Sequence, residues 1–210
     1  MTNHSRPPLS SRKQPKQARS AELVATILEA AVQVLRKEGA QRFTTARVAE
    51  RAGVSIGSVY QYFPNKAAIL FRLQSDEWRQ TAELRSIILE DAQRPPLERL
   101  RTLVHAFIRS ECDEAEVRIA LNDSAPLYRD APEAQEARAS REGAVEVFMR
   151  EALPETSVAT RVLAGNLIAM TLSDVGKHFS QSSRTPAEIE VFAKAMADMF
   201  CVYLGSLARV

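Results

Sequence analysis

The sequence contains little of the material from which catalytic and metal sites are built. Its 210 residues include only two cysteines and three histidines. Cys112 and Cys201 lie far apart inside helical patterns, so neither a disulfide framework nor a Cys-x-x-Cys metal spacing is present, and a reducing cytoplasm fits. The sequence also lacks a His-x-x-x-His spacing and a glycine-rich phosphate-binding loop. These absences argue against an enzyme and against a bound metal or cofactor.

The three histidines form no catalytic arrangement. His4 falls in a tail with little to bury, and His105 flanks an apolar stripe, where a hydrogen-bonded or exposed histidine is more typical than a metal ligand. Asp174 and His178 are four residues apart on one helical pattern and could pair. No nucleophile accompanies them, so a surface or interface pair is the favoured interpretation.

Long apolar runs are missing as well. No run approaches the 18 residues that would span a bilayer, and the N-terminus has no apolar signal-peptide core. We therefore expect no membrane or export segment and a cytoplasmic location.

Charge is unevenly distributed along the chain. The net charge is only +2, but residues 1–66 hold 11 Lys and Arg against four Glu, and the remainder holds an excess of acidic residues. A basic N-terminal third beside an acidic body is typical of a protein that reads nucleic acid with one domain and has a second domain for another task.

The stretch 43–70, FTTARVAERAGVSIGSVYQYFPNKAAIL, predicts two short helices around a tight joint. Thr44 or Thr45 can cap the first helix and Ser55 the second. Gly53 supplies the backbone freedom that a sharp turn needs. Apolar and small side chains are expected on the inner sides: Val48, Ala49, Ala52, Val54, Val59 and Phe63. This pattern fits a DNA-binding helix-turn-helix.

The outer face of the second helix carries no acidic side chain; its residues are Ile56, Gly57, Ser58, Tyr60, Gln61 and Tyr62. A glycine inside a helix costs about 1 kcal/mol relative to alanine. Gly57 therefore suggests a close approach of the backbone to a DNA groove, although a tolerated glycine is the alternative. Asn65 can cap a third helix after Pro64. Lys66 in the first turn of that helix opposes the helix dipole, which favours a phosphate partner.

The runs TTARVAERAG and VSIGSVYQYFPNKAAIL resemble the signature of the tetracycline-repressor (TetR) family of bacterial transcription regulators, over about residues 20–72. The resemblance implies that the second helix of the motif enters the major groove of DNA. It implies phosphate contacts by Thr45, Ser55, Tyr60, Tyr62 and Lys66. It implies positions near base edges for Arg47, Ile56, Gly57 and Gln61, with Ser58 on the same DNA-binding face. Family members often carry tyrosine or tryptophan where this chain has Gln61.

Three segments are expected in the chain. Residues 1–18 are rich in Ser, Pro, Lys and Arg and predict a disordered basic arm. Basic residues there could lie along DNA, or the arm could be a solubilising tail; they are Arg12, Lys13, Lys16 and Arg19. Residues 19–66 are the expected DNA-binding domain, and residues 67–210 the expected effector-binding and dimerisation domain.

Apolar periodicity predicts an all-α protein of about nine helices. Outside the motif, helices are expected over residues 20–38, 65–92, 96–111, 114–122, 132–152, 156–181 and 186–207. Gly39 should end the first of them. The long helix from Asn65 should bury one stripe formed by Ile69, Leu70, Leu73, Leu84, Ile87 and Ile88.

The last two helices have broad apolar faces and small residues that allow close helix contact. Paired with the same two helices of a second copy, they would form a four-helix interface. A palindromic operator also requires two DNA-binding domains, one for each half-site. The alternative is that both helices pack inside one monomer. Both the family resemblance and the number of contacts that DNA specificity requires favour a homodimer.

Proteins of this family usually bind a small organic effector in the second domain. Candidate effector residues are those that the core stripes leave unexplained: Trp78, Arg118, Asn122, Phe148, Asn166, Met170 and Asp174. A Met or aromatic residue at helical spacing more often belongs to the hydrophobic core. A core role is therefore the alternative to effector binding for each candidate.

The sequence as a whole predicts a transcription regulator that reads double-stranded DNA. The favoured interpretation is a repressor that a small molecule releases from its operator. One alternative is a DNA binder of this fold whose second domain engages a protein partner. Another is a dimeric activator.

Overall fold

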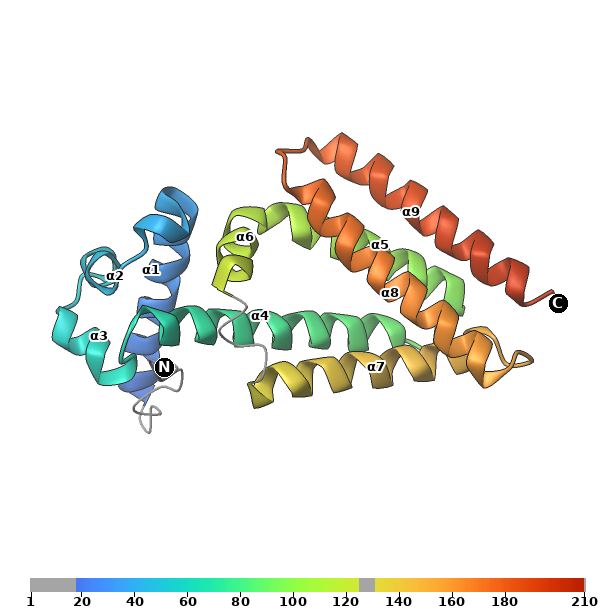
Figure 1. Ribbon diagram of the computed structural model, residues 1–210, viewed down its shortest axis with the longest axis horizontal. Helices are drawn as coiled ribbons and strands as arrows, with labels where there is room; N and C mark the ends of the chain where they lie inside the picture. The colour runs from blue at the N-terminus through green and yellow to red at the C-terminus, as the bar shows by residue number, and fades with distance from the viewer. Residues whose placement is uncertain (1–17, 125–130, 210) are drawn as a thin grey trace, which may run out of the picture. The chain divides into compact units, whose positions relative to one another are not determined.

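The computed structural model describes residues 18–124 and 131–209, and throughout them the regular secondary structure is helical (Figure 1). The basic residues expected along DNA in the arm (Arg12, Lys13, Lys16 and the side chain of Arg19) lie outside the described part. The helices are α1 Ala18–Arg42, α2 Thr45–Ala52, α3 Ile56–Tyr62, α4 Lys66–Leu89, α5 Pro96–Asp113, α6 Ala115–Ser124, α7 Pro132–Ala152, α8 Val158–Ser180 and α9 Pro186–Leu207. The expected all-α fold, with an N-terminal helix-turn-helix and a helical C-terminal domain, is confirmed.

The helices gather into two compact units. Among the described residues, the first contains residues 18–77, 116–124 and 131–134, so that α6 belongs with the N-terminal helices. The second contains residues 78–115 and 135–209. Helix α4 contributes to both units. The domain limits expected at residues 18 and 66 stay predictions, because compactness does not by itself define an independently folding domain.

Helix α1 forms the buttress of the first unit. Its helical geometry breaks at Gly39, whose φ of 73° is the left-handed region that glycine adopts without strain. The core of this unit is apolar and contains Val24, Ile27, Ala31, Val34, Leu35, Phe43, Val48, Ala49, Val59, Phe63, Ile69 and Leu70. Four of the six inward residues expected of the motif are thus buried, whereas Ala52 and Val54 are half-buried.

The expected buried stripe along α4 is wrong in its second half. Leu73 is buried, but Leu84 is 37% exposed and Ile87 is 72% exposed. Helical periodicity identifies residues that share a face, yet it does not say whether another element covers that face. In the described structure only Leu89 is buried near the end of α4.

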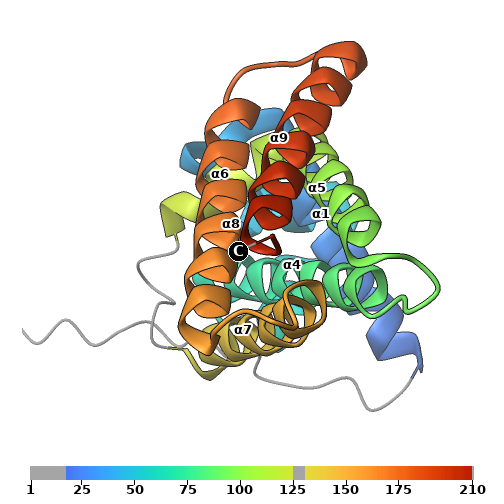
Figure 2. The same ribbon diagram turned by 90° about the vertical axis from the view of Figure 1, so that its right-hand side faces the viewer.

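The second unit is built on α5, which packs against both α8 and α9 (Figures 1 and 2). Its core is a single apolar cluster that includes Leu100, Val104, Ile108, Phe148, Met149, Ile168, Ala193, Met196, Phe200 and Leu204. Gly176 of α8 makes close approach possible: a Cβ there would lie 3.1 Å from Phe107 and 3.2 Å from Ile108. The small residues of α8 thus allow α5 and α8 to pack closely.

Polar side chains fix where the last two helices begin. The Ser157 hydroxyl accepts a hydrogen bond from the backbone N–H of Thr160 at 3.1 Å. Thr185 and Glu188 form a reciprocal capping box ahead of Pro186. Backbone and side-chain hydrogen bonds from Thr185 hold the pKa of Glu188 below its usual value. The helix start expected at Pro186 is confirmed.

Helix α8 is the one helix in the described part of the chain whose length and composition would allow it to cross a membrane. Its mean hydropathy is 1.2, which is marginal, and one face packs into the protein core through Ala164, Ile168 and Leu172. Core helices of ordinary proteins share such a composition, so α8 gives no argument for a membrane segment.

A buried arginine ties three helices together. The Arg99 side chain of α5 is 2% exposed and donates to the Leu89 carbonyl at the end of α4 and to the Glu151 carboxylate of α7. Its guanidinium also lies 5.8 Å from the Phe148 ring centroid. Because a buried cation is costly unless it is paired, Glu151 neutralises a charge that would otherwise oppose folding.

We expect Glu151→Ala to leave the Arg99 cation buried without its counter-ion. Loss of one partner of a fully buried pair costs roughly 3–5 kcal/mol, and because Glu151 is half-exposed we expect about 1–3 kcal/mol in the free energy of unfolding. Chemical denaturation followed by circular dichroism measures the difference. Glu155→Ala removes an exposed carboxylate from the α7–α8 connection and is the matched control; equal stability of the two variants would contradict the assigned role of Glu151.

Candidate nucleic-acid interface and ligand groove

The joint between α2 and α3 sets the angle of the motif. Gly53 has φ 68° and ψ 28°, the left-handed conformation expected of it. Its N–H donates to the Glu50 carbonyl at 3.2 Å, and the next N–H, of Val54, donates to the Ala49 carbonyl at 3.0 Å. These bonds close α2 in the manner of a glycine C-cap and turn the chain sharply into α3.

Both helices of the motif begin at hydroxyl caps. Thr44, and not Thr45, caps α2 by accepting from the Arg47 N–H at 3.3 Å. Ser55 caps α3 by accepting from the Ser58 N–H at 3.0 Å, and the two serine hydroxyls lie 2.8 Å apart. The Asn65 side chain accepts from the Ala68 N–H at 2.9 Å, as expected for the start of α4.

The outer face of α3 is exposed and free of acidic groups. Ile56 is 44% exposed and Tyr60 is 39% exposed, and Gly57, Gln61 and Lys66 are exposed as well. A Cβ built on Gly57 would meet only the Ser55 hydroxyl, at an ordinary 3.6 Å. Packing within the described protein therefore gives no reason for glycine at this position.

Two residues expected at phosphates lie together. The hydroxyls of Thr45 in α2 and Tyr60 in α3 are 3.2 Å apart, within hydrogen-bonding distance. Tyr62 differs from expectation: its side chain is only 5% exposed, so its placement on the outer face was wrong. The helical rotation of α3 places Tyr62 on the same buried face as Val59, while Tyr60 and Gln61 lie on the exposed face.

Arg47 has an acidic partner that sequence reasoning missed. Its guanidinium pairs with the carboxylate of Glu38 from α1, which also lies 3.9 Å from Arg42. The two residues of the first pair are on different helices, nine positions apart, and no local spacing rule connects them. Arg47 is half-buried and held by this contact, whereas the sequence suggested a freely presented side chain.

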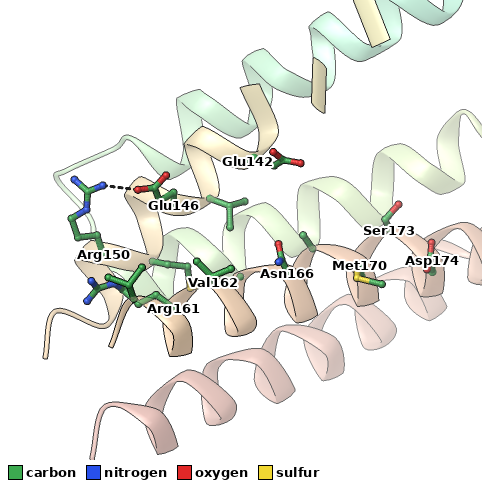
Figure 3. Close-up of a pocket in the computed structure, with 14 residues that line it drawn as sticks. Glu142, Glu146, Arg150, Arg161, Val162, Asn166, Met170, Ser173 and Asp174 are labelled. Carbon is green, nitrogen blue, oxygen red and sulfur yellow. Dashed lines mark hydrogen bonds and ion pairs between the residues drawn. The ribbon is translucent and has the colours of Figure 1, made fainter. Parts of the chain in front are cut away.

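A groove runs between α7 and α8 in the second unit (Figure 3). It has a volume of about 620 Å³ and is open to solvent on one side. Asn166, Met170 and Asp174, which the sequence placed on one line of the penultimate helix, all line it. The other lining residues come from α7 (Glu142, Val145, Glu146, Met149, Arg150) and α8 (Val158, Arg161, Val162, Gly165, Ala169, Ser173). Gly165 faces α7 so closely that a Cβ would lie 2.8 Å from the Val145 side chain.

The remaining effector candidates are not among the described residues that line the groove. Phe148 is 3% exposed and belongs to the hydrophobic core, because its turn of α7 faces α5 and not the groove. Arg118 pairs with Glu77 inside the first unit. Trp78 is half-buried in α4 and does not line the groove, and the side chain of Asn122 lies outside the described residues.

Other chemistry finds no support in the described residues. No three His, Cys, Asp or Glu side chains there come together as a metal site would require. Cys112 and Cys201 are free thiols, and burial raises the pKa of each. His105 lies 3.3 Å from Glu190 at the surface.

Comparison with known proteins agrees with this geometry. The model of bacterial regulatory proteins of the tetR family matches residues 27–73, and that of the tetracyclin repressor-like C-terminal domain matches residues 95–207. The nucleoid occlusion factor SlmA of Vibrio campbellii is 39% identical over 85 residues, which are 39% of this chain and 42% of that relative. The chain thus matches less than half the length of this relative.

Solved structures share the fold along nearly the whole chain. The fatty acid degradation regulator FadR of Bacillus halodurans superposes with a TM-score of 0.65 at 18% identity, over 90% of this chain and 97% of that one. A SmeT–triclosan complex has a TM-score of 0.65 at 18% identity, over 87% and 91% of the two chains. With the C-terminal model alone matching more than half of the residues, the chain belongs to the TetR family of DNA-binding transcription regulators.

Proposed function

We propose that this regulator is a repressor that binds a palindromic operator as a homodimer and leaves it when a small organic effector binds. Family membership supports the DNA-binding part, since TetR-family regulators bind operators, usually as homodimers, and bind small ligands. The single observation that carries the proposal is the exposed outer face of α3, which is free of acidic groups and held on a capped, tightly turned motif. As a regulator of this kind it would act in the cytoplasm.

In this proposal α3 lies in the major groove. Phosphate contacts come from Thr45, Ser55, Tyr60 and Lys66, with the hydroxyls of Thr45 and Tyr60 close enough to share one phosphate oxygen. Tyr62, which is 5% exposed, is not among the proposed contacts. Base edges are read by the exposed residues Ile56, Gly57 and Gln61 and by the half-buried Ser58. Arg47 joins them when its ion pair with Glu38 opens or when its guanidinium binds Glu38 and a base together.

Homodimerisation is supported by apolar surface on the last two helices. Large apolar side chains on α8 outside the groove are exposed: Leu163 66% and Leu167 49%. So are those on α9: Val191 70%, Met199 51% and Val202 72%. Apolar residues repeated at helical spacing on one exposed face are typical of a surface that a partner covers.

An effector in the second unit is supported by the α7–α8 groove, whose volume lies in the range of small-molecule sites. A domain without a cavity would instead have favoured the alternative, in which this unit engages a protein partner. We therefore keep the effector as the proposed regulator of DNA binding.

Lys66→Ala should weaken binding to operator and random DNA alike, because a phosphate contact carries no sequence information. The slope of log K against log salt should fall by about one unit. Fluorescence anisotropy with labelled duplexes at several salt concentrations measures both quantities. Lys177→Ala, which removes an exposed lysine from α8, is the control and should change neither; an unchanged slope for Lys66→Ala would remove this residue from the phosphate contacts.

Gln61→Ala should alter sequence preference and leave random-DNA affinity nearly intact. If Gln61 makes a bidentate contact to a base, its loss costs about 1–3 kcal/mol at one base pair of each half-site. Selection of bound duplexes from a random pool reports the change, with Gln80→Ala of α4 as the control. The same consensus from wild type and Gln61→Ala would contradict base reading by this side chain.

Leu163→Glu should produce a monomer, since it places a charge in the apolar face that the second copy is proposed to cover. Ile87→Glu changes an equally exposed aliphatic residue on α4 and should leave the dimer intact. Sedimentation velocity distinguishes the two states. Dimers of both variants would contradict the proposed interface, and a monomeric wild type would contradict homodimerisation itself.

A further inference from the structure

We propose that Arg47 reads a guanine in each half-site of the operator and that Glu38 of α1 holds its guanidinium in the orientation that this contact needs. The inference rests on the proposed function, in which α2 and α3 dock on DNA, and it adds the base and a positioning residue. It follows from which nitrogen of the guanidinium Glu38 occupies and which nitrogens it leaves open.

Glu38 lies on a firmly packed part of α1. Leu35, one turn earlier, is 1% exposed and belongs to the core of the first unit. The Glu38 side chain itself is 25% exposed, and its Oε2 atom lies 3.9 Å from Nε of Arg42, four residues later. Because the carboxylate is partly buried and anchored on a packed helix, salt and water screen its attraction for a partner less than at an open surface.

The ion pair engages one end of the Arg47 guanidinium. The Glu38 carboxylate contacts Nη1, and this atom is shielded from solvent. No other hydrogen bond or ion pair engages the guanidinium in the described part of the chain, so the N–H groups of Nε and Nη2 remain available. Because 35% of the side chain is exposed, a partner from outside can reach it. Arg47 therefore has one held end and one open edge.

An edge with two parallel N–H groups matches guanine better than the other bases. Guanine presents the acceptors O6 and N7 side by side in the major groove, whereas adenine pairs an acceptor with a donor and thymine carries a methyl group beside its acceptor. Thr45, two residues before Arg47, has its hydroxyl 3.2 Å from that of Tyr60 on the exposed face of α3. Arg47 therefore starts about 3 Å along the helix axis from a residue that borders this face.

The carboxylate favours a base contact over a phosphate contact. An unpaired arginine is attracted to every phosphate of the duplex, and this attraction carries no sequence information. Glu38 offsets part of the Arg47 charge and weakens that attraction. It also restricts rotamers that the side chain would otherwise lose only on meeting a base. The pair therefore shifts the balance toward a contact that depends on geometry.

A second arginine of α2 shows that a tie to α1 needs no negative charge. Arg51, one turn after Arg47, donates from Nε to the side-chain carbonyl of Gln33 at 2.5 Å. An amide oxygen is thus sufficient to hold an arginine of α2 against α1. The substitution Glu38→Gln therefore removes the charge and preserves an oxygen that can orient Arg47.

The test measures base preference position by position. Wild-type protein first selects a consensus duplex from a random pool. Fluorescence anisotropy then compares this duplex with copies that carry one replaced base pair and with the random pool itself. Each half-site should contain a G·C pair whose preference Arg47→Lys lowers by roughly fivefold or more, because an ammonium cannot form the two parallel bonds. Glu38→Ala should lower the preference at the same base pair to a similar extent without weakening binding to the random pool.

Three variants separate orientation from charge and from stability. Glu38→Gln should keep most of the wild-type preference, since its amide oxygen can accept from Arg47. Gln33→Ala removes the other tie between α1 and α2, and Glu50→Ala removes an exposed carboxylate from α2. Both should show the wild-type preference at every base pair. Circular dichroism verifies that each variant is folded.

The outcomes that overturn the inference differ for its two parts. Guanine reading fails if Arg47→Lys keeps the wild-type preference, or if the base pair that it affects is not G·C. The positioning role fails if Glu38→Ala keeps that preference, if it weakens binding to all duplexes alike, or if Glu38→Gln is equally impaired. A wild type that selects no consensus would overturn the proposed function together with the inference, whereas a consensus that the Arg47 variant leaves intact overturns the inference alone.

Discussion

A buried guanidinium is the interaction on which the arrangement of the second unit depends. Arg99 satisfies the carbonyl at the end of α4, pairs with a carboxylate of α7 and lies beside an aromatic ring of the core. Helix α4 begins at Lys66, in the DNA-binding motif, and α7 is one wall of the groove. One side chain of α5 therefore holds the end of the helix that starts at the motif and the helix that a ligand would touch. A displacement of α7 would separate the buried Arg99 charge from the Glu151 carboxylate, which is costly because a buried cation needs a partner.

The motif itself depends on short-range bonds. Left-handed backbone at Gly53 and hydroxyl caps at Thr44 and Ser55 mark where the two helices begin and end. Apolar side chains then fix the crossing of α2 and α3 against α1. Because each of these caps and turns depends on one or two residues, the bounds of α2 and α3 are set locally.

These local features are the ones that sequence reasoning predicted well. The caps at Ser55, Asn65 and Thr185 and the turn at Gly53 need no knowledge of the tertiary structure, since each depends on one or two neighbours. Predictions that required knowledge of a covering element failed. Ile87 shares a helical face with buried residues but is itself exposed. Tyr62 directly follows the exposed Tyr60 and Gln61 in the sequence but is itself buried.

Features that join distant parts of the chain had no signal in the sequence. The pairing of Glu38 with Arg47 and the contact of Gly165 with Val145 depend on how helices pack, and a single sequence does not reveal packing partners. The line formed by Asn166, Met170 and Asp174 was found because residues on one helix face stay together whatever the packing. Phe148 was assigned to the same region because the rotation of α7 about its axis could not be read from spacing alone.

Gly165 has a consequence for how such a regulator can diversify. Because α8 contributes only backbone where it meets α7, the width of the groove at that point is set by Val145 and Met149. Substitutions on α7 would therefore reshape the groove while Leu163 and Leu167, exposed elsewhere on α8, stay unchanged. Under the proposed function, ligand specificity and dimerisation could then evolve separately, although both would use residues of a single helix.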